Sequence, residues 1–247
     1  NFTMTYYINN LNQKIAYKYT KGRTPGIIFV HGLNSNMQGL KALSIEKYAK
    51  KNKLSFLRFD CRGHGKSYGK FENFTVSDWK KDLLDVLDNI TTGPQIIIGS
   101  SMGGWLMMLA AKSRKSRIAG LIGLAPAADF TTYLFNELPM RVQKEINKKG
   151  ISKLKKWNHN YIFTKKFFQE GKKHLVLKKN FLFNRPVILI HGLHDKDVSP
   201  KISQKILQKI SSSNVQIRYL KNSGHRLSNK NELKIINNAI DNMLDLI

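Results

Sequence analysis

A pair of serines between glycines follows an apolar run and contains a side chain that could act as a nucleophile. Residues 95–105 read QIIIGSSMGGW, and residues 99–103 fit the pattern G-x-S-x-G between an expected strand and an expected helix. Such a tight strand-to-helix turn has strained backbone angles, and small residues two positions away on each side relieve the crowding. Only Ser101 has glycine at both positions, because Ser100 is flanked there by larger residues. The pattern predicts Ser101 as the nucleophile, with a glycine-rich turn without chemistry as the alternative.

A serine hydroxyl is a weak nucleophile at neutral pH, so it needs a general base and an acid that orients the base. His225 follows the last expected strand in a glycine-containing loop and is the predicted base. Asp195 and Asp197 follow an earlier strand, and Asp195 is preferred because it occupies the acid position of the pattern HGxxDxxV. Asp129, after the preceding strand, is a third candidate acid. The alternative roles are a turn aspartate that caps a helix and an ordinary loop histidine.

Acyl transfer passes through an oxyanion, which needs two backbone donors. The N–H of Met102 follows the nucleophile and begins a helix whose N-terminus favours developing negative charge. The loop 31–34, HGLN, follows the apolar run GIIFV, and the N–H of Leu33 is the predicted second donor. Gly32 lets the backbone approach closely, and we expect His31 and Gly32 to line the substrate site.

Other polar side chains near strand ends are expected to have structural roles. Residues 60–67, DCRGHGKS, lack the spacing of a phosphate-binding loop, and His64 is expected to be non-catalytic. His191 and His194 do not follow the final strand and are also expected to be structural. Cys61 is expected to be a core or loop thiol, and as the only cysteine it excludes an intrachain disulfide.

The elements that must position these residues alternate between apolar runs of strand length and amphipathic stretches. Strands are expected at residues 5–9 and 14–19, which form an opening hairpin, and at 26–30, 55–59, 95–99, 118–125, 186–190 and 215–220. Helices are expected at residues 42–51, 76–90 (with its N-cap at or near Ser77), 102–113, 200–211 and 229–246. The strand runs are apolar throughout, so the sequence predicts an α/β protein whose mostly parallel sheet has helices on both faces.

The alternation stops over residues 129–183, which contain helical stretches but no clear strand. We interpret this range as a cap inserted into an α/β core that comprises residues 1–128 and 184–247. Aromatic and apolar side chains of the cap are expected to form an entrance for acyl chains: Phe130, Leu134 and Phe135, together with Phe163, Phe167 and Phe168.

The chain of 247 residues is strongly basic, with 42 Lys and Arg against 16 Asp and Glu and a formal net charge of +26. Most of the basic residues are lysines, and Asn and Ile are also abundant, so A/T-rich codons explain much of this charge. Codon usage does not explain why the positive charge is concentrated in residues 141–180. This range contains 13 Lys and Arg but only two acidic residues, Glu145 and Glu170. The cap is expected to be a solvated lid or a surface for an anionic group or a membrane.

Composition limits the remaining function classes. The chain is long enough for one sizeable core, and no run of about 18 apolar residues predicts a membrane span. The single cysteine fits a reducing compartment such as the cytosol, and the segment NFTMTYY at the start lacks the layout of a signal peptide, so a cytoplasmic protein is expected. A nucleic-acid-binding protein is the non-enzyme alternative, but no zinc-finger spacing or ribonucleoprotein-type aromatic motif is present, so no specific nucleic-acid partner is expected.

These motifs together resemble the α/β-hydrolase superfamily across essentially the whole chain: HGLN (31–34), RGHGKS (62–67), GSSMGG (99–104), HGLHDKDV (191–198) and GH (224–225). More narrowly, LRFDCRGHGKS, GPQIIIGSSMGGWLM, LIGLAPAADF and FNELP resemble the mitochondrial palmitoyl-protein thioesterases, also described as mycophenolic acid acyl-glucuronide esterases, and their bacterial relatives. The resemblance implies an eight-stranded sheet, a small cap inserted after the sixth strand, and hydrolysis of carboxylic esters or thioesters.

The predicted function is therefore that of a serine hydrolase that forms an acyl-enzyme. Its expected substrate is a small-molecule or acyl-protein ester or thioester, and no metal or organic cofactor is expected. A C–C bond hydrolase or a small peptidase could use the same triad. Dehalogenases and epoxide hydrolases of this fold place Asp at the nucleophile position, which Ser101 argues against.

Overall fold

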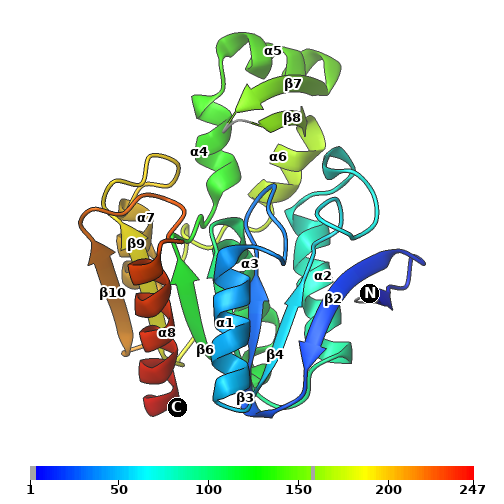
Figure 1. Cartoon of the computed structure of the whole chain (residues 1–247). Coiled ribbons are helices and arrows are strands. Elements are labelled where there is room, and N and C mark those ends of the chain that lie inside the picture. The colour runs from blue at the N-terminus through cyan, green and yellow to red at the C-terminus, as the bar shows by residue number, and fades with distance from the viewer. Residues whose placement is uncertain (1–3, 157–158) are drawn as a thin grey trace.

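One twisted sheet carries the candidate residues at the ends of its strands. A computed structural model describes residues 4–156 and 159–247 and contains an eight-stranded sheet in the order β1-β2-β4-β3-β5-β6-β9-β10 (Figure 1). The strands β1 and β2 pair antiparallel, β2 pairs antiparallel with β4, and the remaining pairs are parallel. The strands are β1 (Thr5–Ile8), β2 (Lys14–Thr20), β3 (Arg23–Val30), β4 (Leu54–Phe59), β5 (Gln95–Ser100), β6 (Ile118–Leu124), β9 (Val187–Gly192) and β10 (Val215–Leu220).

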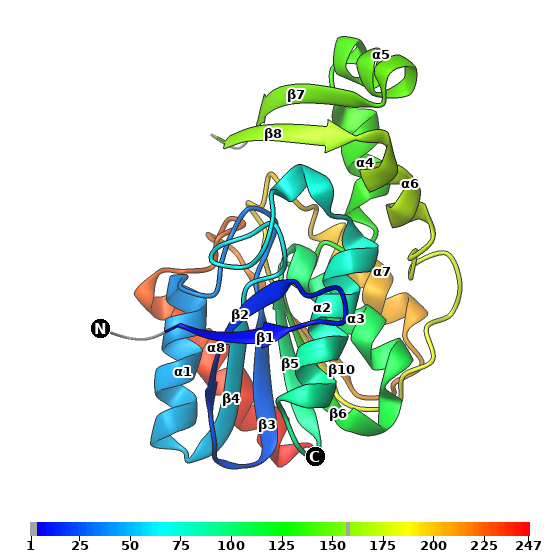
Figure 2. The ribbon, with the colours of Figure 1, turned by 90° about the vertical axis from the view of Figure 1, so that its right-hand side faces the viewer.

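Helices cover both faces of this sheet (Figure 2). One face carries α1 (Leu40–Lys51) and α8 (Lys230–Asp245), and the other carries α2 (Val76–Asn89), α3 (Met102–Ser113) and α7 (Lys201–Lys209). Two short 3₁₀ helices, η1 (Phe71–Asn73) and η2 (Lys115–Arg117), lie in the connections. The predicted fold class, an α/β protein whose mostly parallel eight-stranded sheet has helices on both faces, is confirmed.

The strand β5 shows why its sequence is apolar without alternation. Successive side chains of a strand point to opposite faces of the sheet. Ile97 therefore joins the hydrophobic core under α2 and α3, whereas Ile96 and Ile98 join the core under α1 and α8. Because both faces are covered, every residue of β5 is buried, and the strand ends directly below the turn that holds Ser101.

The segment between β6 and β9 lies above the carboxyl ends of the parallel strands (Figures 1 and 2). It contains α4 (Phe130–Glu137), α5 (Met140–Lys149), β7 (Ile151–Lys156), β8 (His159–Thr164) and α6 (Lys165–Lys172). The expectation of no strand here was wrong, because β7 and β8 form an antiparallel hairpin. Lysines on the outer face of β7 alternate with Ser152 and Leu154 on the inner face, so the strand lacks an apolar run. Residues 157 and 158, within the range 129–183 interpreted as the cap, lie outside the described residues.

Polar contacts join the two ends of the cap to each other and the cap to the core. The carboxylate of Asp129, at the start of α4, accepts hydrogen bonds from the N–H groups of Val176 (2.8 Å) and Leu177 (3.0 Å), which follow α6. The hydroxyl of Ser77 in α2 donates to Glu170 in α6 over 2.6 Å. Asp129 thus joins the two ends of the insertion, and its carboxylate binds these N–H groups rather than His225.

Two smaller features complete the fold. The helix α2 begins at Val76 and its N-cap is Thr75, two residues before Ser77, the position at or near which the N-cap was expected. The Asp78 carboxylate accepts a hydrogen bond from the N–H of Thr75 (2.9 Å). Within residues 4–156 and 159–247, every helix is too short or too polar to cross a lipid bilayer.

Candidate active site

The turn between β5 and α3 holds Ser101 in the conformation that the glycine pattern predicted. Ser101 has φ 53° and ψ −117°, a positive φ that non-glycine residues rarely adopt. A Cβ atom on Gly99 would lie 2.2 Å from the carbonyl oxygen of Gly103, and one on Gly103 would lie 2.1 Å from that of Val30. Both contacts are with backbone atoms that side-chain rotation cannot relieve. The two glycines therefore let α3 start directly against β5 and β3.

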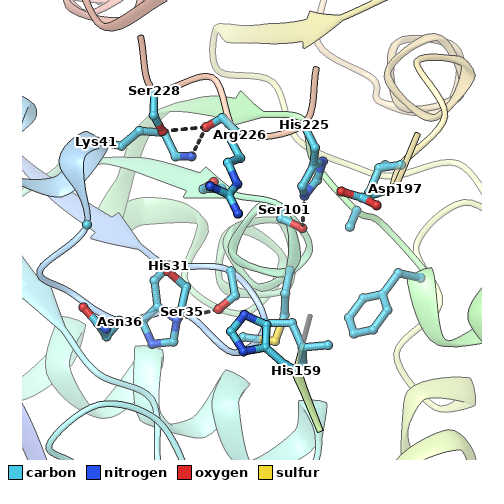
Figure 3. Close-up of a pocket in the computed structure, with 18 of the residues that line it drawn as sticks. His31, Ser35, Asn36, Lys41, Ser101, His159, Asp197, His225, Arg226 and Ser228 are labelled. Atoms are coloured by element: carbon cyan, nitrogen blue, oxygen red, sulfur yellow. Dashed lines mark hydrogen bonds between the residues drawn. The ribbon is translucent and has the colours of Figure 1, made fainter. Parts of the chain in front are cut away.

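Three side chains from distant parts of the chain form a continuous hydrogen-bonded line. The Nε2 atom of His225 lies 3.0 Å from Oγ of Ser101, and its Nδ1 atom lies 2.7 Å from Oδ2 of Asp195. Figure 3 shows the imidazole directed at the hydroxyl. A carboxylate can only accept, so Nδ1 of His225 carries the proton that it donates to Asp195. Nε2 is left free to accept the proton of the serine hydroxyl, which is the arrangement that a general base requires.

The carboxylate of Asp195 is fixed on both oxygens. Its Oδ1 accepts hydrogen bonds from the N–H groups of Asp197 (2.9 Å) and Val198 (2.8 Å). Burial alone would raise the pKa of Asp195, but hydrogen bonds from His191, His225 and Val198 outweigh it and hold this pKa well below its ordinary value. Asp195 is therefore ionised throughout the neutral range and can stabilise a positively charged imidazole beside it.

His191 also contacts the carboxylate of Asp195. Its Nε2 atom contacts the carbonyl oxygen of Val198 (2.9 Å) and Oδ2 of Asp195 (3.2 Å), both acceptors, so Nε2 carries the proton. Its Nδ1 atom accepts a hydrogen bond from the hydroxyl of Ser203 (2.8 Å). This buried histidine in β9 thereby helps to orient the carboxylate of Asp195. Sequence reasoning missed this role of His191. The sequence signal for a role near the site was the dipeptide His-Gly, which occurs directly after β3 and at the end of β9.

The loop after β3 is held by a second buried histidine. Nε2 of His31 accepts a hydrogen bond from the N–H of Cys61 (3.0 Å), so Nδ1 carries the proton and donates to the carbonyl oxygen of Gly32 (2.7 Å). Burial lowers the pKa of His31, which keeps this ring neutral and preserves both bonds. The N–H of Ser35 also donates to the oxygen of Gly32 (3.2 Å). Two hydrogen bonds therefore fix the carbonyl group of Gly32.

Two backbone N–H groups near Ser101 are candidate oxyanion donors, one in this loop (Leu33) and one at the start of α3 (Met102). A Cβ atom on Gly32 would lie 3.2 Å from Cβ of Ser101, so the loop passes close to the serine. Among the backbone hydrogen bonds of the described residues outside regular elements, none is donated by Leu33. Met102 is the first residue of α3, and the first N–H groups of a helix have no acceptor within it. Leu33 and Met102 both line the cavity described next.

A cavity of about 460 Å³ opens between the core and the cap above Ser101, a size typical of small-molecule sites. The core contributes loop residues after β3 and the turn at Ser101, while α4 and β8 of the cap contribute apolar and aromatic side chains. Predicted substrate-site residues that line it are His31, Gly32, Phe130 and Leu134, and cap residues that sequence reasoning missed are Tyr133, Glu137, His159 and Tyr161.

Residues 24–173 match a family model described as serine aminopeptidase, S33. The chain belongs to this family of α/β-hydrolases. Over 234 residues it is 38% identical to the mitochondrial palmitoyl-protein thioesterase ABHD10 of Bos taurus and 39% identical to that of Mus musculus. These matches cover 94% of this chain and 76% and 79% of the two relatives. The structure of mouse alpha/beta hydrolase domain-containing protein 10 superposes with a TM-score of 0.92 at 36% identity, covering 98% of each chain. The protein is therefore an enzyme, a serine hydrolase.

The expected cytoplasmic localisation of this hydrolase is contradicted by the comparison. The relatives with 37–39% identity over 94% of the chain carry the word mitochondrial in their names. The expectation rested on a single cysteine and on the first residues of the sequence. One cysteine excludes only an intrachain disulfide and says nothing about which compartment holds the protein.

Several predicted acyl-chain contacts of this hydrolase lie elsewhere. Phe135 does not line the cavity, and its ring packs against Phe168 with 5.0 Å between centroids. Phe163, Phe167 and Phe168 are buried in the hydrophobic cluster that the cap shares with α2 and α3, and they also do not line the cavity. The rings of Phe167 and Phe168 in α6 pack against Phe163 of β8, and Phe167 also contacts Trp79 of α2. These side chains therefore join the cap to the hydrophobic core under α2 and α3.

The basic residues of the cap also lie away from the cavity. None of the 13 Lys and Arg of residues 141–180 is among the described residues that line it. The two Lys and Arg side chains that do line it are Lys41 in α1 and Arg226, which follows the catalytic-base candidate His225. Any direct interaction with an anionic part of a substrate inside this cavity therefore falls to core residues.

Three further side chains considered from the sequence are His64, Cys61 and Asp197. His64 is buried, its Nδ1 contacts the carbonyl oxygen of Arg62 (3.2 Å), and burial lowers its pKa to about 3. Burial also raises the pKa of the Cys61 thiol well above its usual value, which leaves it unreactive. Neither residue lines the cavity. Asp197 lines the cavity, and its carboxylate lies within 4.8 Å of Asp195 and His225, but the hydrogen bond of His225 goes to Asp195.

Proposed function

We propose that this hydrolase cleaves acyl thioesters and esters with Ser101 as nucleophile, His225 as general base and Asp195 as the orienting acid. The observation that carries this proposal is the unbroken line from hydroxyl to imidazole to carboxylate, with distances of 3.0 Å and 2.7 Å. Asp195 accepts the proton of Nδ1 of His225, so Nε2 of His225 is free to accept the proton of Ser101. This arrangement activates the serine hydroxyl as a nucleophile.

In the proposed cycle, His225 takes the proton of Ser101 as the oxygen attacks the acyl carbonyl. The resulting oxyanion is held by the N–H groups of Leu33 and Met102, which are fixed before the reaction begins. His225 then protonates the leaving thiol or alcohol, and the acyl group remains on Ser101. Water, deprotonated by His225, releases the acid and restores the hydroxyl. Asp195 keeps the proton of His225 on Nδ1 and stabilises the imidazolium in both halves of the cycle.

The cavity supports an acyl substrate with an apolar chain. Phe130, Tyr133 and Leu134 of α4 form its cap side, and Met102 and Leu33 flank the nucleophile. Burying a methylene group gains about 0.8 kcal/mol, so an acyl chain along α4 supplies binding energy without polar contacts. Relatives over most of the chain are named palmitoyl-protein thioesterases, which is consistent with a fatty acyl group in this position.

The experiment compares Ser101→Ala with the matched variant Ser100→Ala. Hydrolysis of a thioester panel of increasing acyl length should fall by at least about 10⁴-fold in Ser101→Ala, as in other triads that lose the nucleophile. A fluorophosphonate probe should label the wild type and Ser100→Ala but not Ser101→Ala. Labelling of folded Ser101→Ala would refute the assignment.

The same panel tests the alternative chemistries. It should include an aminoacyl anilide, because the family model is described as a serine aminopeptidase. Turnover of thioesters without turnover of the anilide supports the proposal. Turnover of the anilide alone would assign peptidase chemistry to the same three residues.

A further inference from the structure

One guanidinium group at the active-site cavity is unused by the fold. Seven of the nine arginines donate side-chain hydrogen bonds within the described residues. In the same part of the chain, the guanidinium of Arg226 takes part in no such hydrogen bond and no ion pair. Arg226 lines the cavity, and Figure 3 shows its guanidinium extending into it on the side of Ser101.

The backbone around this side chain is fixed. The carbonyl oxygen of Arg226 accepts hydrogen bonds from Nζ of Lys41 and from the hydroxyl of Ser228 (2.8 Å), as Figure 3 shows. Leu227 has φ 47° and is buried in the core beneath α1 and α8. A bulky residue adopts such a φ only where its surroundings enforce it. The loop is thus anchored on both sides of a side chain that is left projecting into the cavity.

The charges at this end of the cavity are positive. Lys41 also lines it, beside Arg226, whereas the acidic lining residues are Glu137 on the cap and Asp197. In Figure 3, His225 stands between Arg226 and Asp197, so the two opposite charges lie on different sides of the imidazole. No lysine or arginine of the cap shares the cavity in the described residues.

The geometry points to Arg226 as the recognition residue for an anionic oxygen group, a carboxylate or a phosphate, on the leaving group of the substrate. This inference rests on the proposed function. In that mechanism His225 must reach the leaving sulfur or oxygen to protonate it, so the leaving group lies beside His225. Arg226 is the next residue, and its planar fork of donors matches the two oxygens of a carboxylate or phosphate.

The test uses three thioesters with the same acyl group. Their leaving groups are 3-mercaptopropionate, its uncharged amide 3-mercaptopropionamide, and 2-mercaptoethyl phosphate, and released thiol is measured to obtain kcat/KM. The ratio of kcat/KM for each charged substrate to that for the amide isolates recognition of the charge. We expect a wild-type ratio of about ten or more, the lower range for a hydrogen bond to an ion because Arg226 is exposed. The larger of the two ratios identifies carboxylate or phosphate as the preferred group.

Variants of Arg226 test whether this side chain causes the ratio of kcat/KM between charged and uncharged substrates. Arg226→Gln should bring it to about one, and Arg226→Lys, which keeps the charge without the fork, should give an intermediate value. Lys230→Gln removes an exposed cation four residues away that does not line the cavity and should keep the wild-type ratio. A wild-type ratio near one, or an unchanged ratio in Arg226→Gln, would overturn the inference while hydrolysis of the amide still supports the proposed function. Failure of the wild type to hydrolyse any of the three thioesters would instead refute the proposed function.

Discussion

Replacing Asp195 by asparagine exchanges one carboxylate oxygen for an NH₂ group and should reverse the direction of the hydrogen bonds of His225. The Oδ1 position receives two backbone N–H groups, from Asp197 and Val198, and the amide oxygen of asparagine must take this place. The amide NH₂ group then occupies the position of Oδ2. There it faces Nδ1 of His225 and Nε2 of His191, which lie 2.7 Å and 3.2 Å from Oδ2 in the wild type.

Neither histidine can accommodate this donor without a change. Nε2 of His191 keeps its proton because it also donates to the carbonyl oxygen of Val198, so two donors meet on that side. Nδ1 of His225 must become an acceptor, which moves its proton to Nε2, the atom that faces Ser101. The imidazole then cannot accept the serine proton. We expect kcat to fall by about 10⁴-fold, the effect of the same substitution in another triad, which corresponds to about 5 kcal/mol in the barrier.

The assay is thioester hydrolysis under saturating substrate, with thermal unfolding to show that the variant is folded. Asp197→Asn is the matched control, since it alters a neighbouring carboxylate that accepts no hydrogen bond from His225 in the described structure. Its kcat should change by less than about tenfold. If a folded Asp195→Asn keeps more than about a tenth of the wild-type kcat, or if Asp197→Asn is the more damaging change, the assignment of the acid is wrong.

Three further predictions concern the turn, the cavity charge and the cap. Gly103→Ala should lower the free energy of unfolding by about 3 kcal/mol, or Tm by roughly 10 °C, because its Cβ would lie 2.1 Å from the carbonyl oxygen of Val30. The control Gly39→Ala has no contact closer than 3.8 Å and should change the free energy of unfolding by less than about 1 kcal/mol. Equal Tm values for the two variants would contradict this steric account. Burial, opposed by Glu232 and assisted by Arg226, lowers the pKa of Lys41 to about 8, so this lysine is charged below that pH and neutral above it. The kcat/KM ratio of carboxylate to amide thioesters should therefore decline as the pH rises through 8 and stay level in Lys41→Met, and a level wild-type profile would exclude a contribution from Lys41. Vesicles rich in anionic lipid should bind the protein at about 0.05 M salt and release it at about 0.3 M. The double variant Lys153→Gln with Lys155→Gln, on the outer face of β7, should weaken this binding more than the double variant Lys201→Gln with Lys205→Gln on α7. Equal weakening by the two double variants would argue against a specific role for the cap.

Much of the fold followed from the sequence because its signals are local. Each apolar run of four to eight residues became a strand of the sheet, and the helix expected over 102–113 has those bounds in the structure. The cap hairpin was missed because β7 places lysines opposite Ser152 and Leu154, so its alternation is weakly apolar. Phe135 was misplaced because helical periodicity indicates that a face is buried but does not say whether it faces the cavity or the interior of the cap.

The sequence by itself determined the strained turn at Ser101, because the glycine at position 99 is required by a backbone atom only four residues away, the carbonyl oxygen of Gly103. It also determined which residues follow strands, and therefore which could meet at the carboxyl edge of the sheet. Only the tertiary structure decided that the imidazole of His225 donates to Asp195 rather than to Asp197, and that the cations of the cap lie outside the cavity while Arg226 lies inside. Those outcomes depend on side-chain directions at contacts between residues 30 to 185 positions apart, where no local periodicity carries information.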